Sequence, residues 1–194
     1  FQVTTIPQSS FSQKEVASRL SVLEREVIKC QLCPRLVEWR RRVAAEKRAS
    51  FRDEEYWGKA VPGFGDPTAR LLIIGLAPAA HGANRTGRMF TGDRSGDWLY
   101  RALYRAGFAT QPEAKGRADG LELKDAWVTA TVRCAPPGNK PTTQERETCR
   151  PYLESELDLF DSARVIVTLG GFAFTSLLRI QRARGASIDR PMPK

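Results

Sequence analysis

The chain has 194 residues, an apolar fraction of 41%, and 31 lysines and arginines against 22 aspartates and glutamates, for a net charge of +9. It is long enough to bury a single core, and it has neither an apolar run that could cross a bilayer nor a signal peptide. We therefore expect one cytoplasmic domain with no membrane partner. The excess of positive charge is typical of nucleic-acid-binding proteins.

The first predicted element is an amphipathic helix that begins at a capping box formed by Ser12 and Glu15. Its apolar residues recur at helical spacing: Val16, Leu20, Leu23 and Val27. The helix leads to Cys30, and a second, strongly basic helical segment is predicted over residues 35–48. The first helix therefore packs on a core, and the second presents a charged face.

Apolar runs predict three buried strands, at residues 71–74, 126–132 and 165–169. Helices are predicted after each strand: residues 95–106 up to Gly107, a helix capped by Thr142 and Glu145 in which Pro151 should lie near the start or cause a kink, and residues 172–180. This alternation predicts an α/β fold whose parallel sheet is covered on both faces. The loops after the strands should then surround one crevice at their carboxyl ends.

Four cysteines, Cys30, Cys33, Cys134 and Cys149, form two pairs in the sequence. The first pair has the C-x2-C spacing that places two sulfurs on one metal ion or cluster. A chain with this much core does not need disulfides, so a metal site is favoured. The only histidine, His81, is remote from both pairs, which leaves zinc and an iron–sulfur cluster as equal alternatives for an all-sulfur site.

The loop at residues 75–93 follows the first predicted strand and has neither of the glycine patterns that bind nucleotide phosphates. Its small residues allow a flat ligand to approach the backbone, and Phe90 offers a stacking face. His81, Asn84 and Asp93 add polar groups, although Asp93 is better explained as a helix cap. This composition suits a nucleobase.

The loop begins Gly-Leu-Ala-Pro-Ala at residues 75–79, and residues 132–140 read Val-Arg-Cys-Ala-Pro-Pro-Gly-Asn-Lys. Together with the C-x2-C pair and Cys149, these motifs strongly resemble family 5 of the uracil-DNA glycosylase superfamily over nearly the whole chain. The resemblance implies a three-layer α/β/α sandwich with a central parallel four-stranded sheet. It also implies a structural [4Fe–4S] cluster held by the four cysteines.

The resemblance implies an enzyme of DNA repair that hydrolyses the N-glycosidic bond of uracil, and of other deaminated or etheno bases, after the nucleotide is flipped out of the duplex. Substrate-binding residues would be Gly75, Leu76, Ala77, Ala79 and Phe90. Sister families place a carboxylate or an amide at the position of Ala77 to orient the attacking water. Another residue must therefore hold the water here; we predict Asn84 first and His81 second.

Four cations in or beside the crevice loops are predicted to contact DNA phosphates: Arg85, Arg88, Arg133 and Lys140. The expected partner is uracil-containing DNA, with the double-stranded form favoured, and the expected oligomeric state is a monomer. The alternative function is a metal-bearing module that binds uracil-containing DNA without cutting it. Three features keep this alternative open. Ala77 lacks the carboxylate or amide of sister families, the strand at Ala130 lacks the asparagine with which some superfamily members read the uracil edge, and the family's second motif is not found.

Residues 1–194 are interpreted as one glycosylase domain with a cluster-binding extension at about residues 1–60. The family continues to a second motif, His-Pro-Ser and following residues, which supplies a histidine and a loop that wedges into DNA. This motif is not found before Lys194. We therefore expect the complete gene product to extend beyond Lys194.

Overall fold

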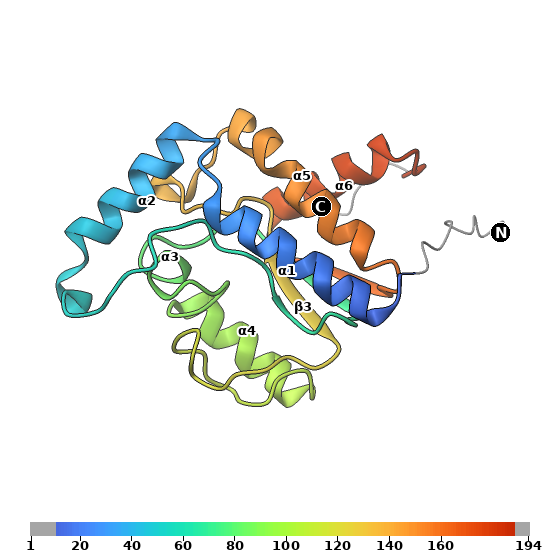
Figure 1. The fold of residues 1–194 in the computed structure, drawn as a ribbon, viewed down its shortest axis with the longest axis horizontal. Coiled ribbons are helices and arrows are strands. Elements are labelled where there is room, and N and C mark those ends of the chain that lie inside the picture. Colours follow the sequence, from blue (N-terminus) through green and yellow to red (C-terminus); the bar gives the residue numbers. More distant parts are fainter. Residues whose placement is uncertain (1–10, 189–194) are drawn as a thin grey trace.

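The computed structural model describes residues 11–188 (Figure 1), so the first ten residues of the predicted extension lie outside it. Its helices are α1 (Gln13–Lys29), α2 (Pro34–Glu46), α3 (Ala83–Thr86), α4 (Arg94–Arg105), α5 (Thr143–Leu159) and α6 (Gly171–Ala183), with short 3-10 helices η1 (Ala49–Phe51) and η2 (Pro137–Asn139). Its strands are β1 (Phe64–Gly65), β2 (Leu71–Gly75), β3 (Ala126–Ala130) and β4 (Val165–Thr168). Within the described residues, no helix combines the length and the apolar character that a membrane span requires.

The four strands form one mixed sheet in the order β1-β3-β2-β4. Strand β2 is parallel to both β3 and β4, whereas β1 pairs antiparallel with β3, with Phe64 opposite Val128. The α/β class and the four strands agree with the sequence, but the prediction of a purely parallel sheet was wrong. The two residues of β1 lie in a stretch rich in Gly and Pro, and only their pairing with β3 makes them a strand.

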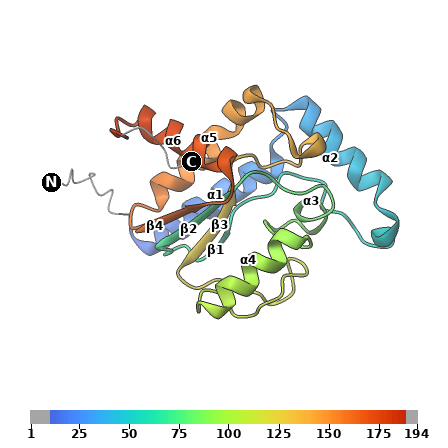
Figure 2. The same cartoon turned by 180° about the vertical axis from the view of Figure 1, so that it is seen from behind.

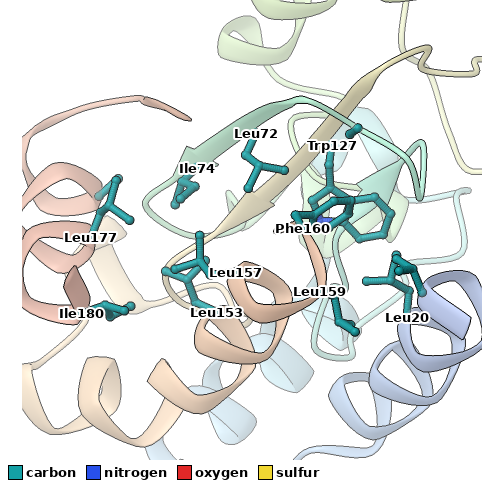
Figure 3. Close-up of a cluster of buried hydrophobic side chains, with 13 residues drawn as sticks. Leu20, Leu72, Ile74, Trp127, Leu153, Leu157, Leu159, Phe160, Leu177 and Ile180 are labelled. Carbon is teal, nitrogen blue, oxygen red and sulfur yellow. The ribbon is translucent and has the colours of Figure 1, made fainter. Parts of the chain in front are cut away.

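One face of the sheet is covered by α1, α5 and α6. Leu72 and Ile74 of β2 point into a cluster of apolar side chains contributed by all three helices, as Figure 3 shows for Leu20, Leu157 and Leu177. Helices α1 and α5 pack against each other in both views of the fold (Figure 1). This layer buries the predicted apolar stripe of α1, so that stripe belongs to the core.

The other face of β2 and β3 is covered by α4 and by the segment that follows it (Figure 2). Tyr100 and Leu103 of α4 pack there with Ile73 and Val128 of the sheet. The edge strand β4 differs, because Val165 is 53% exposed and Val167 is 39% exposed. Coverage of both faces was therefore predicted correctly for the central strands and not for β4, where no described helix covers these two valines.

The helix boundaries follow their local sequence signals. Both predicted capping boxes are present, Ser12 with Glu15 on α1 and Thr142 with Glu145 on α5. Helix α5 nevertheless continues through Pro151, which lies in its middle. Proline removes one helix N–H donor, and the packing of α5 against the sheet and α1 outweighs that loss.

Candidate active site

A cavity of about 890 Å³ opens at the carboxyl ends of the parallel strands. Its lining comes from the loop after β2, from Asn139 beyond β3 and from Leu169 after β4, as the topology rule predicts. Helix α4 closes one side with Arg94, Trp98 and neighbouring residues. Its volume lies within the usual range for small-molecule sites, and its walls are mainly apolar.

The predicted substrate-binding residues gather at this cavity. Leu76, Ala77, Ala79 and Phe90 all line it. Gly75 lies behind them, where a Cβ atom would collide with the ring of Phe90. Glycine is therefore needed at position 75 because the aromatic ring packs directly on the backbone of β2.

The turn that carries Phe90 is held in an unusual backbone conformation. Phe90 has φ of 52°, in the left-handed region that side chains other than glycine rarely adopt. The hydroxyl of Tyr100 donates to the carbonyl of Met89 at 2.7 Å, and the carboxylate of Asp93 accepts from the N–H of Gly96 at 3.0 Å. Asp93 is thus the N-cap of α4, as predicted, and these contacts hold the backbone on both sides of Phe90.

His81 does not line this cavity but lies in an adjoining hollow of about 400 Å³. Its Nδ1 atom lies 3.0 Å from the hydroxyl of Tyr56. Burial lowers the pKa of His81 below its ordinary value, and the charges of Arg48 and Arg85 lower it further. The imidazole is therefore neutral at neutral pH.

Asn84 is completely buried in α3 and does not line the cavity. Its amide nitrogen donates to the carbonyl of Arg40 at 3.2 Å and to that of Ala80 at 3.3 Å. This arrangement connects the cavity loop with α2. The catalytic role of Asn84 stays a prediction. Its burial and the backbone contacts of its amide nitrogen favour a supporting role, although its Oδ1 atom has no hydrogen-bond partner within residues 11–188.

Three of the four predicted DNA-binding cations are buried and paired. Arg85 pairs with Glu54, Arg88 with Asp119 at 2.6 Å, and Arg133 with Glu156 inside the core. Their guanidinium groups already have carboxylate partners, which disfavours contact with phosphate. Lys140, by contrast, is exposed next to η2. The sequence placed positive charge at these loops correctly but could not show that three of the charges are neutralised within the fold.

The four cysteines come together although they are far apart in the sequence. Cys30 and Cys33 lie at the junction of α1 and α2, and they share one pocket with Cys134 and Cys149. All four thiols are free. Burial raises the pKa of Cys134 to about 11 and that of Cys149 to about 12, so binding of a metal must displace thiol protons.

A buried arginine faces this cysteine pocket. Arg40 is only 2% exposed, and its guanidinium donates to Cys134 Sγ at 2.9 Å and to the carbonyl of Cys30 at 2.8 Å. Within residues 11–188 it forms no ion pair, and its Nε atom has no hydrogen-bond partner. A buried cation requires a compensating negative charge, which thiolate ligands would provide.

Comparison with known proteins assigns the chain to a family. A family model described as the uracil DNA glycosylase superfamily matches residues 62–192. A type-5 uracil-DNA glycosylase of Mycobacterium leprae is 56% identical over 165 residues, which cover 84% of this chain and 72% of that protein. The chain belongs to the type-5 family of the uracil-DNA glycosylase superfamily.

Other members of the type-5 family show the same similarity. The type-5 uracil-DNA glycosylase of Thermus thermophilus is 55% identical over 149 residues, or 77% of this chain and 67% of that protein. The protein of that name from Mycobacterium tuberculosis is 58% identical over 162 residues, or 83% of this chain and 60% of that protein. This member of the family therefore spans about 60% of the length of the M. tuberculosis relative.

Sequence reasoning missed several residues of this type-5 site. Arg94, Trp98 and Asn139 line the cavity, and Trp98 is 64% exposed. Trp98 could have been identified from its place one turn into the helix that follows the cavity loop. Asn139 belongs to the motif at residues 132–140 in a loop predicted to lie at the crevice, but the fold was needed to show which residue of that loop reaches the cavity.

Proposed function

We propose that this protein is a DNA repair glycosylase that hydrolyses the N-glycosidic bond of uracil in DNA. The observation that carries the proposal is the single cavity in which Leu76, Ala77, Ala79 and Phe90 meet, in a chain of the type-5 family. The relatives of this family are named uracil-DNA glycosylases. Phe90 offers a face for stacking on the base, and the small residues leave room for the base edge.

The reaction requires a water molecule, a flipped nucleotide and a stabilised leaving group. Water supplies hydroxide to C1′ of the sugar as the bond to the base breaks, and the base leaves with the bonding electrons as an anion that afterwards takes up a proton. The backbone amide of Leu76 is the proposed donor to that anion. Neutral His81 and buried Asn84 both lie outside the cavity lining. We therefore propose that they position the cavity loop and do not contact the attacking water themselves.

We further propose that Cys30, Cys33, Cys134 and Cys149 hold a [4Fe–4S] cluster. The donor set fits, because it consists of four sulfurs in one pocket beside the uncompensated cation of Arg40. One zinc ion would need all four sulfurs at about 2.3 Å. The chemistry of four sulfurs suits zinc and an iron–sulfur cluster alike, and the choice of the cluster rests on the resemblance to family 5. The cluster would supply four iron–thiolate bonds that join α1 and α2 to the β3–α5 region.

The expected partner follows from the charge and the cavity. We propose that this basic chain acts as a monomeric domain on double-stranded DNA that contains uracil. The net charge of +9 supports attraction to the phosphate backbone. The cavity can receive a base only after it leaves the stack, which costs least at a mismatched pair.

The decisive experiment uses a labelled duplex with one G·U pair. The protein is incubated with it and then treated with hot alkali, which breaks the strand at abasic sites. We expect breaks at the uracil position and none in a matched G·C duplex. If the protein produces no breaks yet binds the G·U duplex, the non-catalytic binding module that Ala77 leaves possible becomes the better explanation.

A further inference from the structure

The cavity for the base continues into the adjoining hollow that contains His81. The two hollows share four lining residues, Ala79, Asp93, Arg94 and Asn139. A nucleotide whose base lies in the cavity must connect to the rest of its strand through an opening of this kind. The adjoining hollow is therefore a candidate path for the sugar–phosphate backbone.

Two exposed arginines lie in this hollow. Arg94 lies at the boundary shared by the two hollows, and Arg48 lies in the adjoining hollow alone. Both side chains are exposed, and within residues 11–188 neither forms an ion pair. They differ in this respect from Arg85 and Arg88, which are buried against carboxylates.

The remaining groups of the adjoining hollow favour an anion over a base. Its one carboxylate, Asp93, accepts the N–H of Gly96 as a helix cap, and His81 is neutral. The two aromatic rings are already covered, Trp39 by the guanidinium of Arg42 at 4.8 Å and Phe51 by that of Arg85 at 3.9 Å. Each guanidinium occupies one face of its ring, which leaves less aromatic surface on which a base could stack.

We propose that Arg48 and Arg94 bind successive phosphates of the DNA strand that carries the flipped nucleotide. Arg94, at the boundary, contacts the phosphate nearest the flipped sugar, and Arg48 contacts one farther along the strand. This inference rests on the proposed glycosylase function and adds the path of the strand to it. Phosphate contacts fix the register of the protein on DNA without reading its sequence.

The test compares the full protein with its Arg48→Gln, Arg94→Gln and doubly substituted variants. Binding to a labelled duplex containing one G·U pair is measured by fluorescence anisotropy from low to moderate salt. For the double variant we expect a Kd raised roughly tenfold or more at low salt, and a slope of log K against log salt that is shallower by about 1.8. The matched control is Arg105→Gln, a substitution at the other end of α4 and outside both hollows, which should leave both quantities unchanged.

Two results would overturn the assignment. One is a salt slope equal to that of the wild-type protein, and the other is an affinity loss of the same size in the Arg105→Gln control. The anisotropy measurement requires no base release, so the inference can be judged separately from the proposed function. A wild-type protein that binds but does not release uracil counts against the function alone.

Discussion

At the scale of single residues, the turn around Phe90 depends on an absent side chain. The α-carbon of Gly96 lies against the backbone carbonyl of Phe90, and an added Cβ atom would overlap that oxygen. A backbone atom cannot move aside as the end of a flexible side chain can. Gly96 therefore allows α4 to begin directly beneath the residue that we assign to base stacking.

This close approach predicts a stability loss for Gly96→Ala. We expect unfolding to become easier by about 1–3 kcal/mol, the usual range for overpacking, with a corresponding fall in Tm. The control is Gly116→Ala, because a Cβ atom there meets nothing within 4 Å. If the two variants have equal melting temperatures, the backbone of the turn can shift to make room for the added methyl group, contrary to this prediction.

At the scale of elements, the segment between α4 and β3 is fastened to the cavity loop by one buried ion pair. The side chains of Arg88 and Asp119 are 3% and 11% exposed, and both carboxylate oxygens accept from the guanidinium. The same carboxylate also accepts backbone N–H groups of its own segment. Although burial raises the pKa of Asp119, these hydrogen bonds outweigh it and hold that pKa well below its usual range.

The pair predicts both a mutational effect and a pH dependence. Asp119→Ala leaves Arg88 buried without its partner, and we expect a loss of about 3–5 kcal/mol in the free energy of unfolding. Because the folded-state pKa of Asp119 is lowered, the stability that it contributes is complete above about pH 4 and is lost as the pH falls further. Urea titrations at several pH values measure both effects.

A surface pair provides the comparison for this prediction. Lys115 and Glu113 form an ion pair in which the side chains are 78% and 62% exposed. Exposed pairs contribute little, so Glu113→Ala should change the free energy of unfolding by less than about 1 kcal/mol. A loss as large as that of Asp119→Ala would mean that burial is not what distinguishes the two pairs.

At the scale of the whole molecule, Arg40 connects the cysteine pocket with the cavity loop. Its guanidinium contacts Cys134, and its carbonyl accepts from Asn84 on α3. The proposed cluster would neutralise this buried cation and hold α2 in place. Loss of the cluster should therefore affect the cavity, although the two sites share no residue.

This role predicts that Arg40→Met has opposite effects on two forms of the protein. With the cluster bound, the substitution removes a hydrogen bond to a ligand sulfur, so Tm should fall. Without it, the substitution removes an uncompensated buried charge, so Tm should rise. Thermal unfolding of the loaded and chelator-treated proteins, with iron and sulfide content determined for each, measures this reversal.

The control for Arg40 is an arginine of the same helix. Arg42 is exposed and lies over the ring of Trp39, so Arg42→Met should shift both forms in the same direction. If Arg40→Met also lowers Tm in both forms, the cation is not compensated by the cluster. The proposed reason for its burial would then be wrong.

The helices, strands and motifs that are encoded by residues close together in the chain could be predicted from the sequence. Capping boxes, helical periodicity and apolar runs predicted α1, α5 and the central strands. The alternation of strands and helices predicted a crevice at the carboxyl ends of the strands. The motif at residues 75–79 identified one wall of the cavity, which includes Leu76, Ala77 and Ala79. These signals are local, so they can be read without the fold.

Which of the predicted groups are free to contact a ligand became clear from the folded chain alone. Arg88 pairs with Asp119 and Arg133 with Glu156 across long stretches of chain, Asn84 is buried, and β1 becomes a strand only through its pairing with β3. Whether an arginine faces solvent or a carboxylate depends on contacts between distant segments. The charge of a side chain is a property of the sequence, whereas its availability to a ligand is a property of the folded chain.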